Sequence, residues 1–529
     1  MRTFLQSLVL SLGLALCLPS GAKHFRWASQ GDAASLDPHA QNEGVTNQIN
    51  NMVYERLLDY DKKMKLVPML ATSWENPEPN RWVFKLRRDV KFHDGTPFTA
   101  ADVVFSFDRA KYTTASFKLY ALEVGAARKV DDYTVEFVTT APNPVEPSMV
   151  SNIFIMSKAW CEKNKSARPQ DITHREETFS ALNSNGTGPF ILVAREPGVK
   201  TTHRRNPDWW GTRLGMFEGN VDTVEYRPVA NGATRNAALR SGELDFVLDP
   251  PVQDIASLKE DRAIKVWEGQ ETRVIFVGMD QARDELLYST VKGKNPFKDV
   301  RVRRALYQAI DTQALKTQVM RGLSIPTGIP LPDPVGSGLP ASMEKRPPYD
   351  PAASKRLLAE AGYPSGFGFT ITCPNNRYIN DEKICTALAA MWARVGLDVK
   401  VEAIPRAQFF PKALKLDVSA FIWGWGSDAP DAIFTLKPVL HSLDRAKGLG
   451  TNNAGDYRNA ELDSLIDGAA NEMDMAKRQQ MINRAVALVQ DQVLVMPLHR
   501  QVIPWASRAG VTVVHRPNNQ LNFTWVKVP

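Results

Sequence analysis

The sequence predicts an α/β protein with more than one domain, and three observations support this prediction. The chain has 529 residues, whereas a single hydrophobic core stops growing at about 250–300 residues. Apolar residues make up 43% of the chain and charged residues 23%, which is ordinary for a globular protein. Segments with strand periodicity alternate with segments of helix periodicity, without an internal repeat or a low-complexity tract.

The first residues have the pattern of a leader for export. Arg2 supplies a positive charge, residues 5–18 are mostly apolar, and the small residues 20–22 form a cleavage site. The apolar run is shorter than the ~20 residues that a membrane-spanning helix needs. We therefore expect a signal peptide at residues 1–22. The bulky Leu16 before Cys17 disfavours a lipid anchor.

Elements of both kinds follow in the first third of the chain. Three segments alternate as strands do: residues 24–29, 82–86 and 133–138. Thr99 is a good N-cap for a helix that begins at Ala100, because its hydroxyl can accept a free backbone N–H. Asp102 completes a box-like cap at the third helical position.

The later elements surround an irregular crossing. Residues 301–311 place apolar side chains on one face of an amphipathic helix. Residues 324–350 are rich in proline, and each proline removes a backbone donor. A helix is expected over residues 351–361, with Gly362 after its end. A strand over residues 369–372 precedes a helix that begins near Asp381.

Charge and motifs exclude several classes of function. The net charge of +7 is spread along the chain without a dense basic block, which argues against nucleic acid as a partner. The sequence has no GxSxG, HExxH or P-loop motif, so we expect no enzyme. The eight histidines are scattered, and no His/Cys spacing suits zinc, so we expect no cofactor or metal.

Removal of the leader leaves Cys161, Cys373 and Cys385. An odd number in an oxidising compartment suggests one bridge and one free thiol. Cys373 and Cys385 are close in sequence with a turn signal between them, so we expect these two to pair. Three unpaired thiols are the alternative.

Four ordered segments carry a resemblance to a known family. They are YERLLDYD at residues 54–61, LATSWE at 70–75, WVFKLR at 82–87 and VKFHDGTPFTAADV at 90–103. This series resembles solute-binding protein family 5, the dipeptide- and oligopeptide-binding subunits of peptide-type ABC importers. The resemblance extends over essentially the whole mature chain.

The resemblance implies a two-lobed periplasmic binding protein fold of class II, with an extra domain and a ligand cleft between hinge-connected lobes. The expected division is 23–50, 189–276 and 494–529 for lobe I, 51–188 for its extra domain, and 277–493 for lobe II. The two chain crossings are expected near residues 274–279 and 493–497. Closure of the lobes about this hinge would bury the ligand.

The loop at residues 375–381 is the first candidate ligand site. It lies between a predicted strand and a predicted helix, where α/β proteins usually place ligand contacts. Arg377 offers a planar fork that matches a carboxylate, and Tyr378, the next residue, is also expected to contact the ligand. In dipeptide-binding relatives an arginine of this loop holds the peptide carboxylate, and Arg377 matches that position. The alternative is an arginine paired with a neighbouring aspartate.

The second candidate site is the segment 420–431. A strand should end at Gly426, with Trp423 and Trp425 on the same face. The resemblance implies that Asp428, in a Gly-Trp-x-x-Asp pattern, grips the ligand ammonium, with an aromatic wall beside it. An Asx-type turn at Asp428 and core packing of the two tryptophans are the alternatives. Relatives often carry Asp-Pro where Ala429-Pro430 stands here, which weakens inference about fine specificity.

Together these features predict a periplasmic, monomeric binding component that delivers a di- or tripeptide to an inner-membrane ABC permease. Glutathione, a nickel chelate or another small solute are alternative ligands for the same role. An exported peptidase is the alternative of another class.

Overall fold

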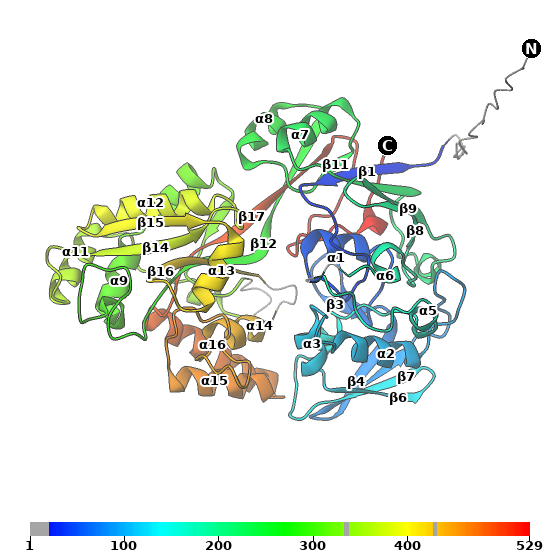
Figure 1. The fold of residues 1–529 in the computed structure, drawn as a ribbon, viewed down its shortest axis with the longest axis horizontal. Helices are drawn as coiled ribbons and strands as arrows, with labels where there is room; N and C mark the ends of the chain where they lie inside the picture. Colours follow the sequence, from blue (N-terminus) through cyan, green and yellow to red (C-terminus); the bar gives the residue numbers. More distant parts are fainter. Residues whose placement is uncertain (1–20, 173, 175, 333–337, 427–430) are drawn as a thin grey trace, which may run out of the picture.

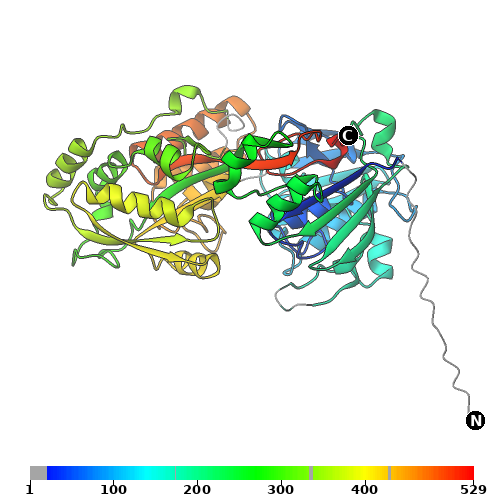
Figure 2. The same cartoon turned by 90° about the horizontal axis from the view of Figure 1, so that it is seen from above.

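A computed structural model describes residues 21–172, 174, 176–332, 338–426 and 431–529. Two groups of elements lie on either side of two long strands, β12 (Ile264–Met279) and β17 (Met496–Arg508), which run between them (Figures 1 and 2). The fold is therefore two-lobed, as predicted. In the described part of the chain, no helix is long and apolar enough to cross a membrane.

One continuous sheet runs through both lobes. Its strand order among the described residues is β15-β14-β16-β12-β17-β11-β1-β10-β9-β8, with β13 paired to β17. The strands on the lobe I side are β1 (His24–Ser29), β8 (Phe190–Glu196), β9 (Lys200–Arg205), β10 (Thr223–Pro228) and β11 (Phe246–Val247). Those on the lobe II side are β13 (Ser324–Pro326), β14 (Gly368–Pro374), β15 (Asp398–Ile404) and β16 (Ala420–Gly426). The predicted strand over residues 24–29 is confirmed.

The described residues of the range 51–188, expected to be the extra domain, contribute no strand to the large sheet. It holds a separate four-stranded sheet of β4 (Ala71–Glu78), β5 (Arg81–Leu86), β7 (Thr134–Val138) and β6 (Ala126–Asp131), and the hairpin β2 (Leu58–Tyr60)–β3 (Leu66–Pro68). Helix α2 (Ala100–Ala110) begins where predicted, because the Thr99 N–H donates to Asp102 Oδ2 at 2.9 Å.

The other helices of the first half are short. They are α1 (Gly44–Asn50), α3 (Lys118–Glu123), α4 (Glu146–Val150), α5 (Lys158–Lys163), α6 (Phe179–Leu182), η1 (Trp210–Leu214), α7 (Gly232–Ser241), η2 (Val252–Asp254) and α8 (Ile255–Glu260). Figure 1 shows α7 and α8 beside the lobe I end of β12 and β17.

Helices cover both faces of the lobe II sheet. One apolar cluster joins β14 and β12 to α9 (Val300–Gln308), α11 (Pro351–Glu360) and α12 (Asp381–Ala393). The opposite face packs on α13 (Arg406–Leu414), α15 (Ala460–Asn471) and α16 (Met475–Asp491). Shorter helical turns complete the lobe: η3 (Pro296–Lys298), α10 (Thr312–Ala314), η4 (Leu315–Val319), η5 (Ala341–Met343), α14 (Ile433–Thr435) and η6 (Leu436–Leu440), with η7 (Phe523–Trp525) near the C-terminus.

The two long strands are paired irregularly where they pass between the lobes. Residues 264–270 of β12 pair with residues 502–508 of β17, and the register then shifts between Gln270 and Val274. The apolar residues 274–279 already belong to lobe II, because they pair with β16 on one side and β17 on the other. The larger irregularity falls on the polar residues 271–273, and a second register shift, between Ile275 and Phe276, lies within the expected crossing. The domain limits themselves stay a prediction.

Candidate functional site

The loop with Arg377 joins the end of β14 to the start of α12. The Asp381 carboxylate holds the loop, since its Oδ2 accepts from the N–H groups of Arg377 at 2.9 Å and Tyr378 at 3.0 Å. Asn380 before the helix has a left-handed φ of 56°. Cys373 of β14 and Cys385 of α12 form a disulfide across the base of this segment, and Cys161 is a buried free cysteine. The loop is therefore fixed at both ends.

The Arg377 side chain is exposed to solvent, yet many protein atoms surround it. This partial loss of hydration, followed by the charge of Arg273, lowers the pKa of its guanidinium. Within the described residues, no side chain or carbonyl accepts a hydrogen bond from the Arg377 guanidinium. The Arg377 Cζ lies over the ring of Tyr378, 5.2 Å from the ring centroid.

Tyr378 is buried and supports the loop. Its hydroxyl donates to the Gly424 carbonyl of β16 at 3.1 Å, and burial raises its pKa. A Cβ on Gly424 would lie 2.5 Å from the Tyr378 ring, so glycine at this position permits the contact. Tyr378 thereby ties the Arg377 loop to the neighbouring strand.

Strand β16 ends at Gly426 as predicted, and its side chains alternate between the two faces. Trp423 is 2% exposed and packs between Phe409 and Phe410, with ring centroids 5.8 and 5.2 Å away. Trp425 is half-buried, and its indole N–H donates to the Phe434 carbonyl at 2.9 Å. Core packing thus accounts for the position of Trp423, whereas Trp425 keeps an accessible surface. Asp428 lies outside the described residues.

A polar cluster at the irregularity of β12 lies next to the Arg377 loop. Arg273 Nε donates to both oxygens of Glu271 at 3.2 Å, and Gln501 Nε2 donates to Glu271 Oε2 at 2.7 Å. The charges of Arg273, Glu271 and Arg406 all act on Arg377. Sequence analysis missed Glu271, Arg273 and Gln501. Charged residues within a strand pattern were the available signal, but their proximity to Arg377 depends on tertiary structure.

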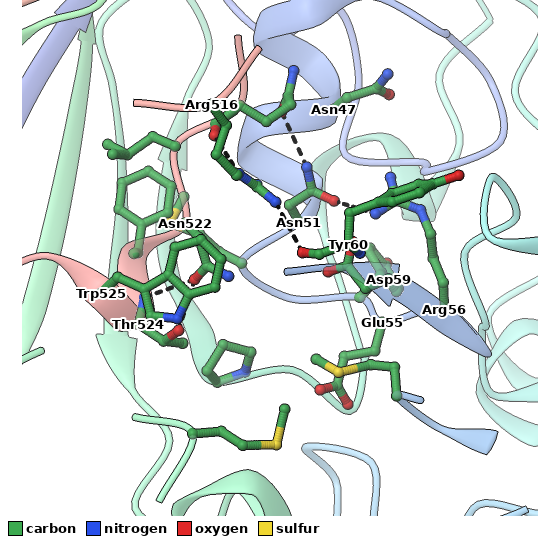
Figure 3. Close-up of a pocket in the computed structure, with 18 of the residues that line it drawn as sticks. Asn47, Asn51, Glu55, Arg56, Asp59, Tyr60, Arg516, Asn522, Thr524 and Trp525 are labelled. Atoms are coloured by element: carbon green, nitrogen blue, oxygen red, sulfur yellow. Dashed lines mark hydrogen bonds between the residues drawn. The ribbon is translucent and has the colours of Figure 1, made fainter. Parts of the chain in front are cut away.

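Lobe I contains a cavity of about 240 Å³. Residues from α1, β2 and the C-terminal segment line it, including those labelled in Figure 3: Asn47, Asn51, Glu55, Arg56, Asp59, Tyr60, Arg516, Asn522, Thr524 and Trp525. Most of these side chains are amides, charged groups or aromatic rings. The segment that lines the cavity also reaches the hinge, because the Thr272 N–H donates to the Pro517 carbonyl at 2.8 Å.

Hydrogen bonds already join several groups at one end of this cavity (Figure 3). Asn51 accepts from Arg56 Nη1 at 2.7 Å and donates to Gln520 Oε1 at 3.1 Å. Arg516 Nη1 donates to the Tyr60 carbonyl at 3.3 Å. This end of the cavity is therefore a preorganised polar wall.

The Glu55 carboxylate lies elsewhere in the cavity wall and is 4% exposed. Both of its oxygens accept indole N–H groups, from Trp209 at 2.9 Å and Trp210 at 2.8 Å. Burial nevertheless raises the pKa of Glu55 to about 7. These bonds join the family-like segment at 54–61 to the distant Trp209 and Trp210, which gives that segment a structural role.

The lobes also touch away from the hinge. Lys437 Nζ of lobe II lies 2.9 Å from Glu123 Oε1 of the 51–188 segment. The ring centroids of Tyr120 and Phe434 are 6.5 Å apart. The two lobes are therefore in contact at these side chains as well as at the hinge.

Comparison with known proteins agrees with this architecture. The sequence pattern described as "Bacterial extracellular solute-binding proteins, family 5 Middle" matches residues 65–447. Heme-binding protein A of Haemophilus influenzae is 28% identical over 494 residues, covering 87% of this chain and 84% of that protein. Glutathione-binding protein GsiB of Pectobacterium atrosepticum is 27% identical over 460 residues, covering 85% and 83%.

A solved structure shows the same fold. The ABC transporter-associated periplasmic binding protein DppA from Helicobacter pylori, in complex with the peptide STSA, has a TM-score of 0.75 and 22% identity to this chain. The match covers 96% of this chain and 98% of that protein. The chain belongs to family 5 of the bacterial extracellular solute-binding proteins, the binding proteins of ABC importers.

Proposed function

We propose that this chain is the periplasmic component that captures a di- or tripeptide and delivers it to a membrane permease. It acts as an exported monomer after removal of residues 1–22. The disulfide between Cys373 and Cys385 supports an oxidising compartment. Neither the capture of the peptide nor its delivery needs covalent chemistry, and the family is a class of binding proteins.

The observation that carries the proposal is the Arg377 guanidinium. It is exposed to solvent, on a loop fixed by Asp381 and a disulfide, with no hydrogen-bond acceptor among the described residues. A guanidinium binds a carboxylate through two parallel hydrogen bonds. We assign the ligand carboxylate to this group.

We assign the ligand ammonium to Asp428, on the Gly-Trp-x-x-Asp pattern, with Trp425 beside it. Two fixed termini would restrict the ligand to about two or three residues, since an extended chain spans at most ~3.3–3.6 Å per residue. The half-buried position of Trp425 supports its place in the site. Trp423 supports the site from within the core. The amide-rich wall of the lobe I cavity offers partners for peptide groups.

Glutathione is the second candidate ligand, and a specific observation favours it. The positive charges of Arg273 and Arg406 both act on Arg377, and Glu271, which pairs with Arg273, balances only part of them. A ligand with two carboxylates would neutralise such a cluster better than a dipeptide with one. A relative named for glutathione binding shares 27% identity with this chain.

Calorimetry with a matched set of ligands tests these assignments. We expect a free dipeptide to bind, and its carboxy-amidated and N-acetylated forms to bind at least tenfold more weakly, a difference of about 1.4 kcal/mol. Equal affinity for the amidated form would contradict the role of Arg377. Tighter binding of glutathione than of any dipeptide would select the second candidate. Cleavage of the peptides during incubation would instead indicate an exported peptidase.

A further inference from the structure

The irregularity between β12 and β17 has the form of a large bulge. Gln270 pairs with Val502 and Val274 pairs with Arg500, so residues 271–273 lie opposite Gln501 alone. Extra residues in one strand interrupt the ladder of backbone hydrogen bonds and let the strands bend. Figure 1 shows the two strands running between the lobes, so bending at the bulge would change the relative position of the lobes.

Hydrogen bonds between side chains take the place of the interrupted backbone hydrogen bonds at this point. Glu271 is 8% exposed and Gln501 is 6% exposed, and Gln501 Nε2 donates to Glu271 Oε2 at 2.7 Å. A buried bond to a charged acceptor contributes more than one between neutral groups. Arg273 balances the buried carboxylate through its Nε. The bulge therefore has a defined polar structure.

The other end of the Gln501 amide reaches the candidate ligand loop. Its Oε1 accepts from the Ile379 N–H at 3.4 Å, which is long for a hydrogen bond of this kind. Ile379 lies two residues after Arg377, on a loop that Asp381 and the disulfide hold. A displacement of Arg377 toward a carboxylate would therefore move Ile379 relative to Gln501. The hydrogen bond from Ile379 to Gln501 is long enough to shorten when the loop moves.

We propose that Gln501 is a positioning residue that couples occupancy of the Arg377 loop to bending of the hinge. The glutamine amide can accept from Ile379 and donate to Glu271 at the same time, because its oxygen accepts and its nitrogen donates. The coupling is the difference in this bridge between the open and closed lobes, since a ligand shifts an equilibrium only through a differential interaction. Its ligand-dependent part rests on the proposed function, but its effect on the empty protein does not.

Two variants and one double variant test the bridge. Gln501→Met keeps the length of the side chain and removes both hydrogen bonds. Gln501→Glu keeps the acceptor for Ile379 but sets a second carboxylate against Glu271. Gln501→Glu combined with Glu271→Gln restores both bonds: residue 501 still accepts from Ile379, and residue 271 now donates to residue 501. None of these changes removes Arg377.

The readout is the distance between spin labels on the two lobes, attached through Lys129→Cys and Lys355→Cys, both at exposed positions. We expect Gln501→Met and Gln501→Glu to change the distance distribution of the empty protein, and the double variant to recover that of the parent. We also expect either single variant to weaken ligand binding by about tenfold, ~1.4 kcal/mol, and the double variant to recover it. Thermal unfolding of each variant identifies any that fail to fold.

Each failure has a distinct meaning. If the folded single variants keep the parent distribution, or the folded double variant does not recover it, the proposed coupling is wrong. If the parent binds no peptide or glutathione but the empty-state distances change as expected, the proposed ligand is wrong and the hinge role of Gln501 stands. If distances change while the affinity of a binding parent does not, Gln501 shapes the hinge without coupling it to the ligand, which also overturns the inference.

Discussion

Removal of the disulfide between Cys373 and Cys385 should lower the free energy of unfolding by about 3 kcal/mol. The two residues are 12 positions apart. In the chain-entropy description, closing a loop of about this length removes ~3 kcal/mol of conformational freedom from the unfolded chain. Both side chains are fully buried, so serine substitutions would add buried hydroxyls with a cost of their own. The double alanine variant is therefore the cleaner perturbation.

Urea unfolding followed by circular dichroism measures this difference. Parent protein, reduced parent and the double variant Cys373→Ala/Cys385→Ala should be compared at one pH. Cys161→Ala is the matched control, because it removes a buried sulfur that forms no disulfide. The reduced parent should lose about 3 kcal/mol of unfolding free energy relative to the oxidised parent. The double variant should lose about 3 kcal/mol beyond the loss that the Cys161→Ala control shows.

The same comparison reports on binding. The disulfide closes the segment that carries Arg377, so its removal adds freedom that the ligand must then restrict. We expect weaker binding in the double variant and unchanged binding in the Cys161→Ala control. If thiol titration proves full reduction but unfolding and binding match the oxidised parent, loop closure contributes nothing and the reasoning fails.

Three further predictions concern single side chains. Arg377→Ala should lose most affinity and Arg377→Lys should keep part of it, because lysine retains the charge but not the fork; calorimetry with carboxy-amidated peptides should no longer distinguish the variants. Asp428→Ala should weaken binding of free peptides by more than tenfold, over ~1.4 kcal/mol, and an unchanged dissociation constant would remove Asp428 from the site. The pKa of Glu55 is raised from 4.5 to about 7, so the stability that its neutral form contributes is complete below pH 4.5 and is lost as the pH rises to about 7. Urea unfolding should show the parent losing stability over that range relative to Glu55→Gln, and parallel pH profiles would exclude a titrating Glu55.

Local patterns predicted the elements of the site well because their causes are local. The strand over residues 420–426 alternates apolar and small side chains, and the structure has these bounds. The helix at Ala100 begins at its cap, where Thr99 and Asp102 are three residues apart. The position of Arg377 between a strand and a helix follows from the same kind of pattern.

Period-two alternation gave the shared face of Trp423 and Trp425 but not their separate environments. Trp423 packs against α13 and is almost fully buried, whereas Trp425 lies two residues further along the strand and is only half-buried. The difference arises because the covering helix contributes Phe409 and Phe410 at only one of the two positions. Sequence spacing within one strand contains no information on where a separate helix ends.

Long-range polar contacts escaped prediction for a related reason. Glu55 and Trp210 are 155 residues apart, and Gln501 and Glu271 are 230 residues apart. Each pair meets only after the lobes have formed. Such a carboxylate looks like a surface residue in the sequence, because the tryptophan or glutamine that satisfies it belongs to a distant segment.

The hinge illustrates why this matters for function. An apolar segment such as 274–279 attracts attention as a strand between lobes, but it pairs with a strand on each side, and its one register shift, between Ile275 and Phe276, skips a single residue of β17. Bending is easier where backbone pairing is interrupted, and there the chain places Glu271, Thr272 and Arg273 instead. Polar side chains can satisfy one another in more than one arrangement, whereas a close-packed apolar strand tolerates few. The polar segment of β12 is therefore the part of the strand suited to move, and it contacts both the Arg377 loop through Gln501 and the lobe I cavity segment through Pro517.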